Sequence, residues 1–356
     1  MTGDDDATAI DDDFARLAEP YRRELLAHCY RMLGSVDDAE DLVQETYLRA
    51  WRSYERFEGR SSLRSWLYRI ATNACLTALE QRGRRPLPSG LGEPSGDPEA
   101  PPAGARTDVP WLQPIPDALV TPDSGDPAAV VAMRDTLRLA LIASLQYLPA
   151  RQRAVLLLRD VLGWPAAEVA ELLAMSTVAV KSALQRARAR LDEVAPAAED
   201  VTEPAEPELR ALLDRYIAAF ENSDAAALEK LLRQEASLEM APSPTWFAGR
   251  VTCARYLAAQ AIGSKGDWLM IPTMANGQPA AAAYLRGADG TYNAFAIAVL
   301  TAAAARDGIA PGGIAPDGGR AGNGAGAGIS RITLFGEPGL FPAFGLPAAR
   351  PPRPAR

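Results

Sequence analysis

The sequence predicts a multidomain fold, with two all-α domains followed by an α+β domain. Apolar residues recur at helical spacing over residues 14–82, and the same spacing returns over residues 129–193, broken by two short turns. From residue 207 onward, two helical patterns precede several short apolar runs separated by turn signals. Helices followed by strands are typical of an α+β domain. The intervening stretches, 83–128 and 194–206, are rich in Pro, Ala and Gly and are predicted to be linkers.

The first all-α domain, residues 14–82, follows an acidic tail over residues 1–13. Its first helix carries an apolar face and ends at Gly34. Its second helix begins near Asp37, and we expect two faces on it. The packed face would carry Ala39, Leu42, Val43, Thr46, Leu48 and Trp51, and the exposed face would carry Glu40, Asp41, Gln44 and Glu45. An acidic surface is unsuited to DNA and favours a basic protein partner.

The third helix of this domain follows the short polar segment 58–62. It combines arginines with aromatic residues, namely Arg64, Trp66, Tyr68 and Arg69, and also carries Asn73. Such a mixture is typical of single-stranded DNA binding, in which rings stack on bases and guanidinium groups contact the backbone. Aromatic residues at helical spacing are more often part of a core, so the roles of Trp66 and Tyr68 stay open.

The linker over residues 83–128 shows neither helical nor alternating apolar spacing. A coil of about 50 residues has a root-mean-square span of about 40 Å and can extend well beyond 100 Å. This composition predicts a flexible tether. The apolar patch over residues 109–114 does not suit a tether, and we expect it to pack against another part of the protein.

The second all-α domain, residues 129–193, has the pattern of a helix-turn-helix. One helix stops at Gly163, Pro165 suits the first turn of the next helix, and Ser176 is a plausible N-cap for a basic third helix. The N-terminal part of such a third helix reaches base edges, and its later basic residues neutralise phosphates. A solvated helix of a bundle is the alternative interpretation. The predicted base-proximal residues are Ser176, Thr177, Lys181, Ser182 and Gln185, and the predicted phosphate contacts are Arg186, Arg188 and Arg190.

The α+β domain is predicted over residues 207–346, with a curved antiparallel sheet and a tail at 347–356. Turn signals such as residues 287–290 separate its strands. A stretch rich in Gly, Ala and Pro, residues 306–328, is predicted to be a disordered insertion.

Three motifs taken together resemble the sigma-70 family of bacterial RNA polymerase initiation factors, in its small extracytoplasmic-function (ECF, group IV) form. DAEDLVQETYLRAW is similar to the polymerase-binding helix of region 2, FEGRSSLRSWLYRIATNAC to its promoter-melting part, and residues 148–191 to region 4. The resemblance implies two partners, core RNA polymerase and promoter DNA. It assigns polymerase binding to Asp38, Glu40, Asp41, Leu42, Gln44 and Glu45. It assigns the melted minus-10 element to Glu58, Gly59, Arg60, Ser61, Ser62, Arg64, Trp66, Arg69 and Asn73, and the minus-35 element to the helix that begins at Ser176.

The C-terminal motifs LEMAPSPTWFAGR, IPTMANGQPAAAAYLRG and ITLFGEPGLFPAFGLP resemble the SnoaL-like branch of the NTF2-like superfamily. This resemblance implies a cone-shaped domain with a hydrophobic pocket, for which Glu239, Trp246, Tyr284 and Tyr292 are the candidate lining residues, with Glu235 also considered. Proton-transfer chemistry would need a carboxylate with a raised pKa and a partner group, but the domain contains no histidine. We therefore expect the domain to regulate the factor through a small ligand or an intramolecular contact, rather than to act as an enzyme.

Composition is consistent with these expectations. The net charge of −8 would oppose DNA binding if it were evenly spread, but the acids concentrate in the tail, the second helix and the linkers. The three cysteines are far apart and lack metal-ligand spacing, so we expect buried free thiols, no metal and no cofactor. The acidic N-terminus is unlike an export signal and no apolar run could span a bilayer, which predicts a cytoplasmic protein without membrane contact. A plain helix-turn-helix regulator and a bifunctional enzyme remain the alternatives.

Overall fold

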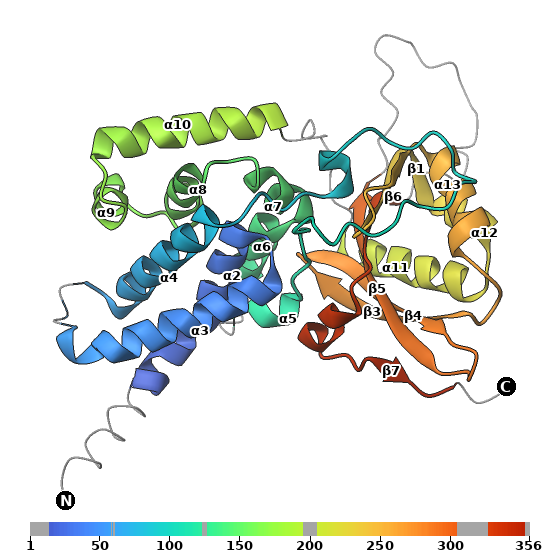
Figure 1. Ribbon diagram of the computed structural model, residues 1–356, viewed down its shortest axis with the longest axis horizontal. Coiled ribbons are helices and arrows are strands. Elements are labelled where there is room, and N and C mark those ends of the chain that lie inside the picture. The colour runs from blue at the N-terminus through green and yellow to red at the C-terminus, as the bar shows by residue number, and fades with distance from the viewer. Residues whose placement is uncertain are drawn as a thin grey trace, which may run out of the picture. The chain divides into compact units, whose positions relative to one another are not determined.

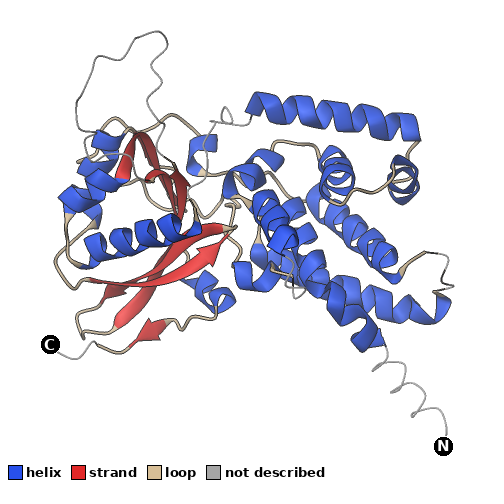
Figure 2. Cartoon of the chain, turned by 180° about the vertical axis from the view of Figure 1, so that it is seen from behind, coloured by secondary structure: helices blue, strands red, loops and turns tan. Residues whose placement is uncertain are grey.

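The computed structural model describes residues 14–57, 59, 61–122, 127–194, 205–304 and 327–352. It divides into two compact units, the first formed by residues 1–87, 107–197 and 275–277 and the second by residues 88–106, 198–274 and 278–356. In its described residues, the first unit has no strand apart from its short segment 275–277, and the second combines a sheet with helices (Figures 1 and 2), so the predicted fold class is confirmed. The acidic tail, Glu58, Arg60 and most of the predicted insertion lie outside the described residues.

The N-terminal part of the first unit contains the three expected helices, α2 (Arg22–Leu33), α3 (Val36–Ser53) and α4 (Leu63–Glu80). Gly34 ends α2 with a left-handed φ of 72°, a conformation that glycine adopts at little cost. The side chains of Ser35 and Ser62 cap α3 and α4 by accepting backbone N–H bonds of 3.2 Å from Asp38 and 3.1 Å from Ser65. The helix boundaries thus follow from local signals.

The predicted packed face of α3 is wrong at two positions. The buried stripe consists of Ala39, Val43, Thr46 and Ala50, which recur at steps of four, three and four residues. Leu48 and Trp51 fall on the other side and are 48% and 43% exposed. Apolar character alone placed them in the core, whereas the helical period places them on the surface.

The second helical part of the first unit begins after the short helix α5 (Asp117–Val120). It consists of α6 (Pro127–Leu137), α7 (Leu139–Leu145), α8 (Ala150–Leu156), α9 (Ala166–Leu172) and α10 (Thr177–Val194), and one π-helical turn (Leu157–Val161) continues α8. Gly163 has a φ of 70° and ends that turn as predicted. Ala174, with a φ of 51°, forms the break before α10. The helix-turn-helix is therefore present.

Two buried arginines connect the helical parts of the first unit. The Arg153 guanidinium donates to the Met32 carbonyl oxygen and, at 3.1 Å, to Gln146 Oε1. Arg31 Nη2 donates to Thr136 Oγ1 at 2.7 Å. Burial lowers the pKa of each arginine to about 10. Burying a cation against neutral acceptors is costly, so this contact is more polar and less stable than a fully apolar core.

The apolar patch of the linker, residues 109–114, packs as expected through Trp111 and Leu112, although Pro110 is exposed, and the neighbouring Ile115 is buried as well. Trp111, Leu112 and Ile115 are 4%, 1% and 0% exposed within the first unit. The turn 275–277 belongs to the same unit, and Asn276, with a φ of 57°, accepts a 3.0 Å bond from the Ile115 N–H. Asn276 Nδ2 also donates to Tyr30 Oη and to the Leu137 carbonyl oxygen, both at 2.8 Å. This part of the linker is thus built into the unit.

The second unit is the α+β domain. Its helices are α11 (Glu206–Glu221), α12 (Ala225–Leu231) and α13 (Arg250–Tyr256). The sheet has the order β2-β1-β6-β5-β4-β3, with β7 paired to β5. The strands are β1 (Leu232–Ala241), β2 (Trp246–Ala248), β3 (Trp268–Ala275), β4 (Gln278–Arg286), β5 (Tyr292–Ala303), β6 (Gly328–Phe335) and β7 (Ala349–Arg350).

The expectation of an antiparallel sheet is wrong for one pair, because β1 and β6 run parallel, with Leu238 opposite Ile332. The core lies where the sheet meets α11, around Leu238, Leu300 and Tyr216. Strand β4 contributes four consecutive alanines, residues 280–283, each at most 4% exposed. Ala281 and Ala283 belong to the helix-facing core, whereas Ala280 and Ala282 are buried on the opposite face, since side chains alternate along a strand.

The chain's thiols and its single histidine are buried. Cys29, Cys75 and Cys253 are free and buried, as predicted. His28 is 1% exposed, and its Nε2 lies 3.0 Å from Thr72 Oγ1. Burial, aided by the nearby Arg31 charge, lowers the pKa of His28 to about 3. None of the described helices is both long and apolar enough to cross a bilayer.

Candidate nucleic-acid interface

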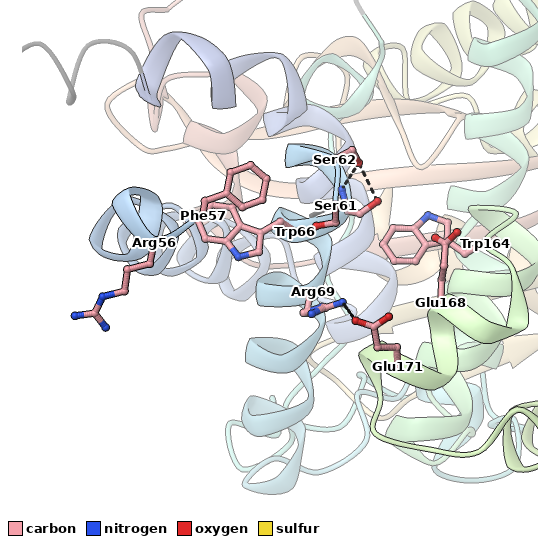
Figure 3. Close-up of a pocket in the computed structure, with 10 residues that line it drawn as sticks. Arg56, Phe57, Ser61, Ser62, Trp66, Arg69, Trp164, Glu168 and Glu171 are labelled. Atoms are coloured by element: carbon pink, nitrogen blue, oxygen red, sulfur yellow. Dashed lines mark hydrogen bonds and ion pairs between the residues drawn. The ribbon is translucent and has the colours of Figure 1, made fainter. Parts of the chain in front are cut away.

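A cavity of about 630 Å³ lies within the first unit and collects most of the described residues assigned to the minus-10 element (Figure 3). One wall comes from α4 and the segment that precedes it, and the other from α9 and the turn before it. The lining residues are Arg56, Phe57, Ser61, Ser62, Ser65, Trp66 and Arg69 on the first wall, and Trp164, Glu168 and Glu171 on the second.

The first wall is a row of side chains along one face of α4. Trp66 and Arg69 lie one turn apart, and the exposed Asn73 follows one turn later. The Trp66 ring stacks on Phe57, with 4.7 Å between the ring centroids. This places an aromatic surface beside a guanidinium group, the combination that a single-stranded base and its phosphate require. Tyr68, by contrast, is 1% exposed and belongs to the core.

The second wall carries residues that the sequence analysis did not single out. Arg69 Nη2 donates to Glu171 Oε1 at 2.8 Å, as the dashed line in Figure 3 shows. The Trp164 ring meets the Tyr68 ring edge-on at 5.7 Å between centroids. Glu168 and Glu171 are three residues apart on α9, so an acidic edge on this helix was readable from the sequence, but its partner was not.

Two other residues assigned to the minus-10 element are placed differently. Arg64 is held by Glu24 through bonds of 2.7 and 2.9 Å, and it lies over the Tyr68 ring at 5.0 Å. This hydrogen bonding to Glu24 raises the pKa of Arg64. Arg64 therefore has an intramolecular role in this structure. Gly59 is described, with a φ of 66°, and lies outside the cavity lining.

Helix α10 presents an exposed basic face. Lys181, Gln185 and Arg186 are exposed, whereas Ser176 Oγ caps the helix by accepting a 3.1 Å bond from the Ala179 N–H. Arg188 pairs with Asp160 at 2.7 Å and Arg190 with Glu193 at 2.8 Å. Thr177 is exposed and Ser182 is half-buried. Val178, which was not among the predicted contacts, is 72% exposed near the start of this helix.

The face of α3 assigned to polymerase is mixed in character. Asp38 is only 14% exposed and pairs with Arg82 and Arg85, whereas Asp41 and Gln44 are exposed. Glu45 pairs with Arg49 at 2.6 Å. Glu40 and Leu42 are half-buried. The exposed Leu48 and Trp51 extend the same side of the helix, so the face combines acidic and apolar side chains.

The four pocket candidates of the second unit are all engaged in hydrogen bonds, and Glu239 and Trp246 lie opposite each other on β1 and β2. Glu239 is 0% exposed and accepts the Ser89 N–H at 3.0 Å. Trp246 Nε1 donates to the Gly92 carbonyl oxygen at 2.8 Å. Tyr284 donates to Pro347 at 2.9 Å and Tyr292 to Gly266 at 2.8 Å. Within the described part of the chain, no cluster of three or more His, Cys, Asp or Glu side chains could hold a metal ion.

Comparison with known proteins shows which family the two helical parts of the first unit match. Residues 17–85 match the family model described as sigma-70 region 2, and residues 138–191 match sigma-70 region 4. The ECF RNA polymerase sigma factor SigG of Mycobacterium tuberculosis (strain H37Rv) is 51% identical over 94% of this chain and 84% of its own length. The ECF sigma factor SigW of Bacillus subtilis is 29% identical over 51% of this chain and 87% of its own length.

The crystal structure of the Mycobacterium tuberculosis ECF sigma factor SigJ has the same fold. It superposes with a TM-score of 0.54 at 22% identity and covers 94% of this chain and 99% of that one. In the present chain, the helical parts that match regions 2 and 4 are followed by an α+β domain. The chain therefore belongs to the ECF group of the sigma-70 family of RNA polymerase sigma factors.

Proposed function

We propose that this sigma factor holds its two DNA-reading parts in a closed arrangement and opens before it directs initiation at a promoter. The observation that carries the proposal is the 2.8 Å ion pair between Arg69 and Glu171. Arg69 belongs to the wall expected to bind the melted minus-10 strand, and Glu171 belongs to the helix-turn-helix. The Glu171 carboxylate binds the Arg69 guanidinium and so competes with a DNA phosphate for it.

The spacing of the two promoter elements supports the same conclusion. The minus-35 and minus-10 positions are about 25 base pairs apart, or about 85 Å along B-DNA. Glu171 and Thr177 are six positions apart in the chain, so at most about 20 Å separates the Arg69 contact from the start of α10. In the closed arrangement, α4 and α10 cannot reach both elements together.

In the open form, each surface has a distinct role. Trp66 stacks on a base of the melted strand and Arg69 contacts its phosphate, while Lys181 and Gln185 on α10 read the minus-35 duplex. The α3 face around Asp41 and Trp51 binds core RNA polymerase. Binding energy alone opens the strands, so the factor needs no catalytic residue.

The α+β domain regulates the change between the closed and open forms rather than catalysing a reaction. Its relatives are sigma factors, and the four side chains considered for a pocket are all hydrogen-bonded, Glu239 and Trp246 to residues 89 and 92 of the linker and the two tyrosines to residues 347 and 266. The site of action is the cytoplasm, where polymerase and promoter meet.

The test is the Glu171→Gln variant of the full chain. Exposed ion pairs contribute about 0.2–1 kcal/mol, so the variant should bind a single-stranded minus-10 oligonucleotide up to about fivefold more tightly, as measured by fluorescence anisotropy. Glu206→Gln is the matched control, because Glu206 forms a comparably exposed pair with Arg210 on α11. The closed arrangement would be ruled out as the block to DNA binding if Glu171→Gln and Glu206→Gln bound the oligonucleotide with equal affinity and Arg69→Ala bound it as tightly as the wild type.

A further inference from the structure

We propose that the α+β domain binds residues 88–106 of the linker, here called the strap, and that the strap is released when regions 2 and 4 separate on a promoter. The inference rests on the proposed function and adds the surface through which the α+β domain acts. That surface is formed by the end of β1, the turn 242–245, β2 and the helix that begins at Arg250.

Backbone hydrogen bonds fix the strap along its length. The Ser95 N–H donates to the Trp246 carbonyl oxygen at 2.8 Å, and the Arg106 N–H donates to that of Pro242 at 2.9 Å. The Ala103 N–H donates to Thr245 Oγ1 at 2.9 Å. Apart from one short turn, Pro88–Gly90, the strap has no regular structure of its own. Its conformation therefore depends on the domain it contacts.

Glu239 holds the start of the strap. Its side chain is buried, and Oε2 accepts the Ser89 N–H at 3.0 Å. Arg331 Nη1 lies 3.5 Å from Oε1, which has no hydrogen bond. A buried carboxylate is costly unless donors surround it, so the amide of Ser89 is part of what makes this burial possible. Among the residues considered for a pocket, Glu239 is thus assigned to the linker.

The opposite side of the surface holds the middle of the strap through exposed side chains. Arg255 Nη2 donates to Glu99 Oε1 at 3.0 Å, and Gln260 Nε2 donates to the Glu99 carbonyl oxygen at 2.7 Å. Trp246 adds the 2.8 Å bond to the Gly92 carbonyl oxygen. Most strap residues remain exposed, and only Pro88 and Pro98 are buried. A segment held by hydrogen bonds rather than by a large apolar area can be released and rebound.

The length of the linker explains why release matters. Between the end of α4 and the start of α6 lie 46 residues, 81–126, of which the strap takes 19 and leaves 27. Full extension of 27 residues spans about 90 Å, which barely exceeds the separation of about 85 Å between the promoter elements. A bound strap adds only its own fixed end-to-end distance to this span, so it shortens the reach of the linker, whereas a free linker of 46 residues extends to about 150 Å.

Covalent locking of the strap tests the inference. The E99C/R255C variant joins two exposed positions, and a short bismaleimide should cross-link them, since the three native thiols are buried. The matched control is E206C/R210C, which cross-links two positions within α11. Each protein is combined with core RNA polymerase and a promoter carrying both elements, and open complexes are measured by permanganate footprinting.

We expect the cross-linked E99C/R255C protein to form at least tenfold fewer open complexes than its uncross-linked form, while cross-linking leaves the control unchanged. Equal activity of both cross-linked proteins would overturn the inference, and so would failure of residues 99 and 255 to cross-link. If the uncross-linked proteins also formed no open complexes, the proposed function itself would fail. The two failures are therefore distinguishable.

Discussion

Val178 has an exposed position from which it can contact a base of the minus-35 element. It is 72% exposed and lies on the same side of α10 as Lys181, which is three residues further along. The N-terminal residues of such a helix face base edges, and apolar side chains there contact the methyl group of thymine. Polar and basic side chains on this helix predicted DNA contacts, whereas an apolar residue such as Val178 carries no such signal in the sequence.

Replacing thymine by deoxyuridine in the minus-35 element tests this contact. Loss of one methyl contact costs about 0.8 kcal/mol. When the contacted thymine is replaced by deoxyuridine, the wild-type protein should therefore bind the site about fourfold more weakly than the unsubstituted site. Val178→Ala should lose the same amount on thymine DNA and show no thymine preference, as measured with holoenzyme by filter binding. Val251→Ala, at the 58% exposed second residue of α13, should behave as wild type. A thymine preference retained by Val178→Ala would exclude the contact.

His28 makes the stability of the first unit dependent on pH. Its pKa is lowered from 6.5 to about 3 in the folded chain, so between these values the unfolded chain binds more protons than the folded one. Stability is therefore complete above pH 6.5 and is lost as pH falls below it, by about 1.4 kcal/mol per pH unit. Between pH 7.5 and 5.5, urea denaturation should show about 1.4 kcal/mol more loss for the wild type than for His28→Gln. Equal losses would mean that His28 is protonated in the fold.

The exposed side of α3 is the element on which polymerase binding should depend. Asp41 and Glu45 supply charge, and Trp51 supplies an apolar surface that is 43% exposed. The D41R/E45R variant should lose polymerase binding while its circular dichroism spectrum stays unchanged. Trp51→Ala should weaken binding at least fivefold, since a truncated interface tryptophan commonly costs more than about 1 kcal/mol. Val131→Ala, a 55% exposed position on α6, serves as control. Unchanged affinity in both α3 variants would assign polymerase to another surface.

The ends of helices were easier to predict than the tertiary contacts that the helices make. Ser35 and Ser62 mark helix starts through hydrogen bonds to residues three positions away, and Gly163 marks a helix end through its left-handed φ, so the sequence reveals these boundaries directly. The pairing of Arg69 with Glu171 joins residues 102 positions apart, and no local pattern encodes it. The parallel pairing of β1 with β6 escaped prediction for the same reason, because apolar alternation does not indicate strand direction.

At the scale of the whole molecule, the long-range contacts of linker residues 88–106 were likewise not predictable from the sequence. Its composition correctly indicated that residues 88–106 have almost no helix or strand, but the inference of a passive tether was wrong. Their bonding partners, such as Glu239 and Trp246, lie more than 140 positions away. Irregular segments bind through backbone groups that every residue carries, so composition cannot reveal their partners.

Removal of the α+β domain should show whether this domain activates or inhibits transcription initiation. A chain ending near residue 204 lacks the surface that holds the strap, so its linker is free. With core RNA polymerase in vitro, this shortened chain should initiate more transcripts than the full chain from the same promoters. Thermal melting serves as the control, because the truncation also removes Asn276 from its contacts with Tyr30 and Leu137. A changed promoter preference would show that the domain contributes to DNA recognition and is not purely regulatory.

The alanines of β4 determine how this domain can change over evolutionary time. Residues 280–283 are buried on both faces of the sheet, so any larger side chain meets a packed layer whichever way it points. Overpacking of this kind costs about 1–3 kcal/mol, and glycine weakens a strand interior. Mutational drift at these four positions is therefore confined to residues of nearly the same volume. In a set of diverging descendants, this strand would stay almost uniform although it carries no chemistry, and its uniformity would record packing rather than function.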